Sequence, residues 1–267
     1  MENKPSKFSN LFLIIVFIIM YLPLGYLIFY SFNSGGNMNT FESFTFDHYL
    51  AVFSDKRLIN IVLNTIILAL LSSLIASVIG TLGAISIYYS KSKKFKKRVL
   101  SLNSVLMVLP DIMMGASFLI LFSILIKIPM GFLSVLLAHI AFSIPIVVLM
   151  VLPRLYALNE DMIRAAEDLG AEDMTILNKI ILPNIASGIF AGFFMALTYS
   201  LDDFAVTFFV TGSGFSTLSI EIYSRVRTGI SLEINALSAL IFAIALIMVI
   251  IYYMIERREA KRNEQGI

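Results

Sequence analysis

Long runs of apolar residues without a charged side chain dominate the chain. Four such runs cover residues 8–41, 58–90, 128–153 and 234–255, and two more, 99–126 and 180–220, carry aspartates as their only charges. A bilayer core of roughly 30 Å needs about 20 apolar residues per helix. The pattern therefore predicts an all-α polytopic membrane protein, a single transmembrane domain over residues 1–267, with six spans at 11–31, 60–89, 100–126, 132–153, 185–211 and 236–255.

The composition narrows the function classes. The chain is 58% hydrophobic and only 14% charged, and its mean hydropathy is +0.88, which is not typical of a water-soluble protein. It has no cysteine and two histidines, which excludes a disulfide framework, a thiol nucleophile and a Cys/His zinc site. A net charge of +2 does not indicate a nucleic-acid partner. We expect membrane lipid as the surroundings, and no metal.

The distribution of basic residues predicts the orientation. Fifteen of the 20 lysines and arginines lie at the two ends or in the loops after the second and fourth spans. The positive-inside rule places those segments, and both termini, in the cytoplasm. The first span lacks a cleavage pattern and is interpreted as an uncleaved anchor. The basic run KSKKFKKR at 91–98 is interpreted as an orientation signal, with contact to an ATPase or to lipid as the alternative.

The residue pattern of the longest cytoplasmic loop, 154–184, predicts two short helices. Asn159 is placed to cap the first, and Gly170 to end it in a left-handed conformation. The second starts near Asp173, and Pro183 marks its end or a bend. An apolar helix face outside the membrane favours a docking partner. The residues of this face are Met162, Ala165, Ala166 and Leu169. The alternative is that the helix lies on the lipid headgroups. The loop has six acidic and three basic residues, and anionic lipid should repel that balance.

Four motifs resemble a known family. RAAEDLG at 164–170, nine residues and then IILP at 180–183 resemble the EAA loop of binding-protein-dependent ABC importer permeases, except that the leading Glu of the family is Arg164 here. LPDIMMG at 109–115, SLDDFAVTFFVTG at 200–212 and IEIYSRVRTGISLEINALSAL at 220–240 are similar to the spermidine/putrescine permease branch of that family.

The resemblance implies a non-catalytic permease with the type I (MetI-like) fold in a bacterial cytoplasmic (inner) membrane. It implies a heterodimer with a second permease subunit, two ABC ATPase subunits that bind the ATP, and an extracytoplasmic polyamine-binding protein. No cofactor is expected in this chain, which has no nucleotide-binding motif. Glu167 or Asp168 would replace the missing carboxylate at 164. The ATPase-coupling residues so implied are Arg164, Ala165, Ala166, Glu167, Asp168 and Gly170.

Carboxylates inside the predicted spans need a reason, because each costs roughly 2.5–3.5 kcal/mol at the bilayer centre. Asp111 follows a proline that can kink the third span, and Asp202 and Asp203 are neighbours on the fifth. One hypothesis is that they offer a counter-charge to a passing polyamine; the other is that they satisfy packing partners or lie near a helix end. The candidate pathway residues are Asp202, Asp203, Asp111, Ser200, Tyr199 and Tyr49.

Other residues and functions were weighed against this interpretation. His139 in the fourth span is expected to be a hydrogen-bonded packing residue. The stripe Ser72, Ala76, Gly80 and Gly83 indicates close helix packing, within the chain or at the interface with a second permease. Another cationic or small polar solute remains an alternative cargo. A secondary polyamine transporter or an intramembrane aspartyl hydrolase is the alternative of another class, and neither explains the EAA-like loop.

Overall fold

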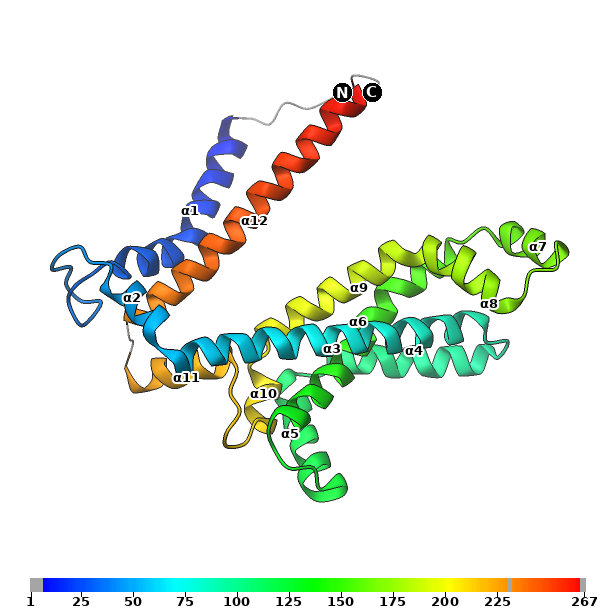
Figure 1. Cartoon of the computed structure of the whole chain (residues 1–267), viewed down its shortest axis with the longest axis horizontal. Coiled ribbons are helices and arrows are strands. Elements are labelled where there is room, and N and C mark those ends of the chain that lie inside the picture. Colours follow the sequence, from blue (N-terminus) through cyan, green and yellow to red (C-terminus); the bar gives the residue numbers. More distant parts are fainter. Residues whose placement is uncertain (1–6, 230–231, 265–267) are drawn as a thin grey trace. The chain divides into compact units, whose positions relative to one another are not determined.

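A computed structural model describes residues 7–229 and 232–264, which are helical apart from loops and one isolated bridge between Asn33 and Phe44. Figure 1 shows the helices coloured along the chain. Their order is α1 Lys7–Tyr30, α2 Asp47–Ser54, α3 Lys56–Tyr89, α4 Lys93–Val108, α5 Asp111–Ile120, the π-helix η1 Leu121–Ile126, α6 Phe132–Tyr156, α7 Glu160–Asp168, α8 Asp173–Ile176, the π-helix η2 Leu177–Ile181, α9 Leu182–Asp202, α10 Ala205–Val210, α11 Leu218–Thr228 and α12 Leu232–Glu264.

The chain divides into two compact units. The first comprises residues 1–59 and 222–267, and the second comprises residues 60–221. In the first, α12 packs against α1 and α2. The loop between α1 and α2 is organised by the buried Asn33, whose side-chain nitrogen donates to the carbonyls of Asn37 at 2.9 Å and Thr40 at 2.8 Å.

In the second unit, α6 packs against both α3 and α9. Val147 of α6 is fully buried, and it packs against two glycines, Gly80 and Gly192, that leave room for its side chain. A Cβ added to Gly80 of α3 would lie 2.7 Å from the Val147 Cβ, and one added to Gly192 of α9 would lie 3.2 Å from the Val147 Cα. The stripe that contains Gly80 therefore packs within the chain, which decides between the two alternatives for it.

Among the residues that the structure describes, four helices are long and apolar enough to cross a membrane, and one bent pair would make a fifth crossing. The four are Asn10–Tyr30, Lys56–Tyr89, Phe132–Tyr156 and Asp173–Asp202. They overlap the first, second, fourth and fifth predicted spans, and α12 contains the sixth. The chain is thus a multi-pass membrane protein, while the number of six spans stays a prediction.

The third predicted span, 100–126, is broken rather than kinked. The axes of α4 and of α5 with η1 meet at 107°. Leu109 has an extended conformation (ψ 135°), as a residue before proline should, and Pro110 has no N–H with which to continue the α4 ladder. Asp111 thereby becomes the first residue of a new helix.

The prediction of one helix over 185–211 is wrong. Helix α9 ends at Asp202, Asp203 is extended (ψ 124°), and α10 begins at Ala205. No proline or glycine marks this break. The Asp203 side chain causes it locally, because it accepts hydrogen bonds from the N–H groups of Val206 and Thr207 and so starts the next helix.

Pro183 does not end a helix, although such an end is one of the two sequence-based expectations for it. The segment Asp173–Asp202 is one helix, with Pro183 in the first turn of α9. The π-helix η2 precedes it and widens the helix where the proline ring would meet a carbonyl. Asn184 helps to satisfy the local backbone, because its side-chain nitrogen donates to the Ile180 carbonyl at 2.7 Å.

Asp55 joins the helices of the first unit and makes its stability depend on pH. Its Oδ1 accepts from the Leu58 N–H at 3.1 Å and the Arg57 N–H at 2.9 Å, and its Oδ2 accepts from the Arg225 guanidinium at 3.1 Å. The Leu58 N–H above all, with Arg225 and the Arg57 N–H, holds the pKa of Asp55 below its ordinary value.

A group with a lowered folded-state pKa stabilises the fold above its unfolded pKa, and this contribution is lost as the pH falls through the folded value. The thermal midpoint of the purified native chain should fall between pH 6 and pH 3. In Asp55→Asn we expect this fall to be smaller, because the variant has no carboxylate to protonate at this position. An exposed carboxylate, Asp47, gives the control Asp47→Asn. An acid-induced drop of equal size in the native chain and in Asp55→Asn would contradict this.

Candidate functional site

Two helix breaks come together in the second unit. Helix α5, which follows the first break, packs along α10, which follows the second. Gly115 allows the close approach: a Cβ there would lie 2.7 Å from Phe209 Cδ2 and 3.1 Å from the Ala205 carbonyl oxygen. Interrupted helices leave backbone groups at their ends free for ligands, and membrane transporters place substrate sites at such ends. These breaks are therefore the first place to look for a pathway.

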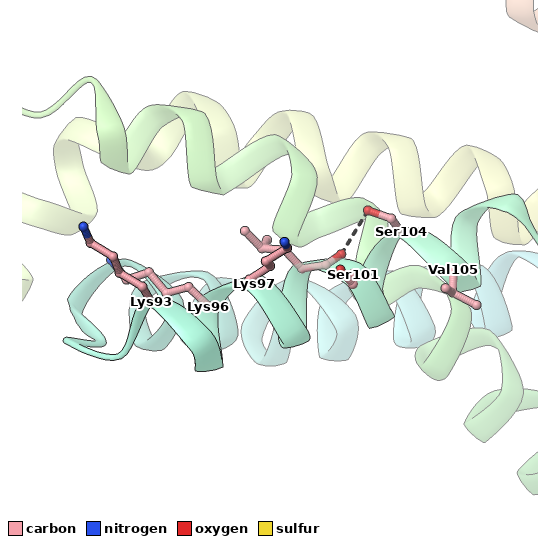
Figure 2. A pocket seen from close by; sticks show the side chains of 7 residues that line it. Lys93, Lys96, Lys97, Ser101, Ser104 and Val105 are labelled. Carbon is pink, nitrogen blue, oxygen red and sulfur yellow. Dashed lines mark hydrogen bonds between the residues drawn. The ribbon is translucent and has the colours of Figure 1, made fainter.

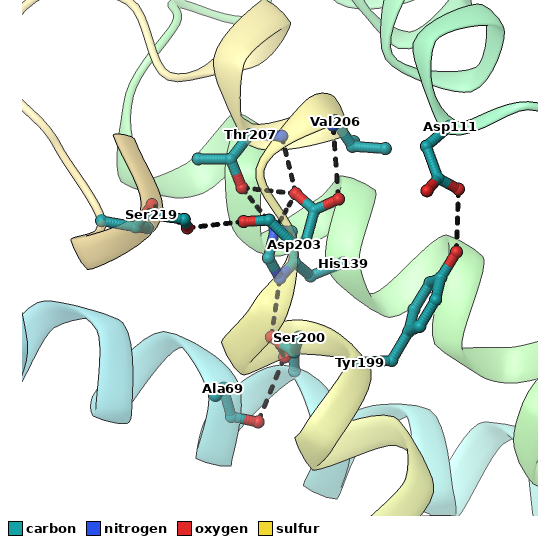
Figure 3. Close-up of polar contacts among 11 residues, drawn as sticks. Ala69, Asp111, His139, Tyr199, Ser200, Asp203, Val206, Thr207 and Ser219 are labelled. Carbon is teal, nitrogen blue, oxygen red and sulfur yellow. Dashed lines mark hydrogen bonds and ion pairs between the residues drawn. The ribbon is translucent and has the colours of Figure 1, made fainter. Parts of the chain in front are cut away.

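Asp111 lies exposed at the start of α5 and meets Tyr199 of α9. The Tyr199 hydroxyl donates to Asp111 Oδ1 at 2.8 Å (Figure 3). The Tyr199 ring packs edge-on against Phe142, with ring centroids 5.0 Å apart. The start of a helix favours a carboxylate through its dipole. Asp111 is thus held by a tyrosine while its second oxygen can accept from a ligand.

Asp202 is the last residue of α9, and its side chain is exposed. It makes no ion pair or side-chain hydrogen bond in the part of the chain that the structure describes. The final carbonyls of a helix carry partial negative charge, so a carboxylate at that position adds to an electronegative end that attracts cations. Asp202 is the carboxylate of the pair that is open to a ligand.

Asp203 has the opposite environment. Its side chain is 5% exposed, and its Oδ2 accepts from the Thr207 N–H at 2.8 Å and the Thr207 hydroxyl at 2.7 Å (Figure 3). Its Oδ1 accepts from the Val206 N–H at 3.3 Å, and His139 Nε2 lies 3.4 Å from Oδ2. A carboxylate used in this way holds the chain between α9 and α10. The two aspartates that the sequence treats alike thus differ: Asp202 is exposed, and Asp203 is buried and hydrogen-bonded.

His139 and Ser200 complete the buried network around Asp203. The Thr207 hydroxyl gives its proton to Asp203, so its oxygen accepts from His139 Nε2–H at 2.9 Å. His139 Nδ1 lies 2.7 Å from the Ser200 hydroxyl, which in turn lies 3.0 Å from the Ser72 hydroxyl of α3. The network joins α3, α6, α9 and α10. His139 is the hydrogen-bonded packing residue that its mid-span position predicts, and Ser200 belongs to the same network rather than to an open surface.

Tyr49 belongs to the first unit. Its hydroxyl lies 2.6 Å from the Ser31 hydroxyl, and its ring lies 5.0 Å from that of Phe32 between centroids. It lies in the first turn of α2 and is half-buried. The structure therefore gives Tyr49 a packing role in its own unit.

The second candidate site is the helix α7 with its flanks. Asn159 caps it as predicted, with Oδ1 accepting from the Asp161 N–H at 2.9 Å, and Gly170 ends it with φ 77°. The expected single apolar face is divided in two. Ile163 and Ala166 pack onto the core of the second unit. Met162 and Leu169 face away from it, and Leu169 is 89% exposed.

The charges on α7 are exposed as well. Arg164 donates to Glu160 Oε2 at 3.1 Å, but the two side chains are 69% and 65% exposed, so this pair contributes little to folding. Ala165, Glu167, Asp168 and Gly170 are exposed, and no ion pair is formed by Glu167 or Asp168 within the described residues. An exposed leucine between free carboxylates is a surface that suits a partner with apolar and basic groups.

Chemistry at either site is limited by the side chains present. No group of three or more His, Asp or Glu suited to a metal ion occurs among the described residues. The breaks offer carboxylates, an aromatic ring and helix ends, which bind cations without transforming them. Sequence reasoning missed that Asp203, His139, Ser200 and Thr207 form one network; the spacing of His139 from the other three gives no signal for it.

Residues 76–261 match the family described as binding-protein-dependent transport system inner membrane component. The spermidine/putrescine transport system permease protein PotC of Escherichia coli (strain K12) is 37% identical over 252 residues, which cover 94% of this chain and 95% of that protein. The putrescine transport system permease protein PotI of the same strain is 30% identical over 271 residues, covering 98% and 96%.

A solved structure shares the fold. One chain in the crystal structure of a bacterial ABC transporter involved in the import of the acidic polysaccharide alginate matches with a TM-score of 0.73 and covers 94% of both chains. Its sequence identity is 18%, so the match concerns the fold alone.

Proposed function

Because the chain belongs to the family of binding-protein-dependent transport system inner membrane components, it is a permease subunit of an ABC importer, and we propose that its cargo is a polyamine. Such a permease works with a partner permease, an ATPase and a binding protein. We further propose a heterodimer of permeases with two ATPase subunits, which bind the ATP, and an extracytoplasmic binding protein. Both termini and α7 would lie in the cytoplasm, as the basic residues indicate.

The observation that carries the cargo proposal is the pair of exposed carboxylates, Asp111 and Asp202, at two helix breaks. A polyamine has several ammonium groups joined by methylenes. Each ammonium can pair with a carboxylate, and the methylenes can lie on an aromatic ring such as Tyr199. The names of the two E. coli relatives agree with a polyamine. Asp203 holds the break in shape and does not contact cargo in this proposal.

The proposed mechanism is alternating access driven by the ATPase. When ATP closes the two ATPase subunits, they carry α7 with them. Because α7 packs through Ile163 and Ala166 onto the core of the second unit, its displacement is passed to the helices that hold the breaks. The exposed Leu169 and the free acidic groups Glu167 and Asp168 would contact the ATPase.

The experiment is uptake of labelled spermidine by cells that express the chain with its partner subunits. Asp202→Asn should lower the uptake rate at subsaturating spermidine roughly tenfold, because one ammonium loses its counter-charge, worth about 1.4 kcal/mol. Asp47→Asn removes an exposed carboxylate of the first unit, which is not a residue of either break, and should leave uptake unchanged. If the native importer moves no polyamine, the cargo proposal fails; if Asp202→Asn transports as well as the native chain, the pathway assignment fails.

Arg164, which stands where the family has Glu, gives a prediction about binding of the ATPase. Arg164 is exposed and its pairing with Glu160 contributes little to the fold, so we infer that it meets an acidic group on the ATPase. Arg164→Glu should lower the co-purification of the ATPase about threefold to tenfold, and Arg164→Lys much less. Tighter binding of the ATPase by Arg164→Glu would contradict a matched acidic partner.

A further inference from the structure

The first two turns of α4 concentrate positive charge without any compensating carboxylate. Five cations occupy these turns, and no acidic residue occurs in the helix. Cations in the first turn oppose the helix dipole, and like charges four residues apart, such as Lys93 and Lys97, repel each other. One of the five is engaged: Lys96 Nζ donates to the Tyr88 carbonyl at 2.7 Å. The others, which form no ion pair within the described residues, are Lys93, Lys94, Lys97 and Arg98.

A groove begins at these lysines and runs along α4. Its hollow of about 700 Å³ is lined by Lys93, Lys96 and Lys97 at one end and by Leu100, Ser101, Ser104 and Val105 further along the helix (Figure 2). The Ser104 hydroxyl donates to the Leu100 carbonyl at 2.9 Å, whereas the Ser101 hydroxyl has no partner in the described part of the chain. The groove therefore changes from a cationic end to a stretch where hydroxyl and aliphatic side chains alternate.

A second hollow lies on the adjoining face of α4. It has about 460 Å³ and shares Lys97 and Ser101 with the first, adding Lys94, Arg98 and Leu102. No residue of α4 is fully buried; Leu102 is 67% exposed and Val105 53% exposed. The helix thus presents cations at one end and uncovered aliphatic side chains one to two turns further on.

We propose that these hollows form a binding site for an anionic phospholipid, with its phosphate on Lys93, Lys97 and the Ser101 hydroxyl and its acyl chains along Leu102 and Val105. From Lys97 to Val105 the helix rises about 12 Å, the distance over which a phospholipid changes from headgroup to hydrocarbon. Basic pockets at the cytoplasmic ends of membrane helices suit anionic headgroups. This site rests on the membrane orientation proposed above and is independent of the cargo.

The absence of tryptophan from the chain allows a direct test. Leu102→Trp places a single fluorophore beside the groove of the full-length chain, which is then reconstituted in phosphatidylcholine bilayers. A bromine-labelled lipid, either phosphatidylglycerol or phosphatidylcholine, is added at equal mole fraction. We expect phosphatidylglycerol to quench with an apparent affinity at least about fivefold higher, given the contribution of each lysine near an anionic lipid.

Two charge-matched variants test the assignment to α4. Lys93→Gln with Lys97→Gln should abolish the preference for phosphatidylglycerol. Lys91→Gln with Lys179→Gln removes two exposed charges from the same side of the membrane but outside both hollows, and should retain it. Inorganic phosphate at constant ionic strength should not displace the lipid, because it offers no acyl chain to the aliphatic end.

Three results would overturn the proposal. Equal quenching by both lipids would show that the groove has no preference for an anionic headgroup. A loss of the phosphatidylglycerol preference in both double variants would show that it depends on the total positive charge of the cytoplasmic side and not on a site on α4. A retained preference in Lys93→Gln with Lys97→Gln, together with loss of ATPase co-purification, would assign the lysines to the ATPase. If spermidine uptake fails while the lipid preference is intact, the cargo proposal fails and the lipid site stands.

Discussion

Replacing Asp203 with alanine is expected to lower the free energy of unfolding by about 3–5 kcal/mol, because it removes the charged partner of a buried polar network. The change leaves the Thr207 N–H without its 2.8 Å acceptor and the Val206 N–H without its own. His139, fully buried, loses the neighbouring carboxylate. We expect α10 to detach from the end of α9. Chemical unfolding of the purified chain in detergent, followed by circular dichroism, measures the effect.

The neighbouring aspartate provides the control. Asp202 is exposed and has no side-chain partner among the described residues, so Asp202→Ala should change the free energy of unfolding by less than about 0.5 kcal/mol. Asp203→Asn keeps one acceptor oxygen for the backbone and should lie between the two. Equal destabilisation by Asp202→Ala and Asp203→Ala would contradict the division of the pair into an open and a structural carboxylate.

The sequence predicts the helices of this protein better than their interruptions. Charge-free runs of about 20 residues locate the spans because only a helix satisfies the backbone in hydrocarbon. Within such a run apolar side chains occur on every face of the helix, so the 3.6-residue period that marks one buried face in soluble proteins gives little guidance. The break at Leu109 and Pro110 is visible through the proline, although the 107° angle is not.

The break after Asp202 has no such marker. It depends on the Asp203 carboxylate capturing the Val206 and Thr207 N–H groups, and a sequence does not tell whether an aspartate will cap a backbone or face a pathway. His139 shows the same limit: its partners Ser200 and Thr207 lie 61 and 68 residues away. Tertiary packing alone brings them together.

Sequence signals predict a helix end correctly where the end depends only on neighbouring residues. Asn159 and Gly170 fix the two ends of α7 because capping and left-handed termination depend on neighbouring residues. Pro183 misled for the opposite reason. The π-helix Leu177–Ile181 directly precedes α9 and accommodates the proline ring, so one helix runs from Asp173 to Asp202 through a position that suggests an end.

Replacing Gly80 with alanine is expected to destabilise the chain by about 1–3 kcal/mol, the range for overpacking in a close-packed interior. The new Cβ would lie 2.7 Å from the Cβ and Cγ1 of Val147, and these atoms sit close to the α6 backbone, so the helix rather than a flexible side-chain end must move. On the other side of Val147, Gly192 of α9 leaves no slack. The free energy of unfolding in detergent measures the cost.

Gly83 provides a control three residues along the same helix. A Cβ there would meet its nearest neighbour, Val148 Cγ2, at 3.8 Å, an ordinary contact. Gly83→Ala should therefore be neutral or slightly stabilising, since alanine favours the helix. Trimming Val147 to alanine in the Gly80→Ala background should recover part of the loss, so that the double variant is less destabilised than the two single variants added together. Strict additivity would mean that Gly80 and Val147 do not touch, and that α6 is held by other contacts than the glycines of α3 and α9.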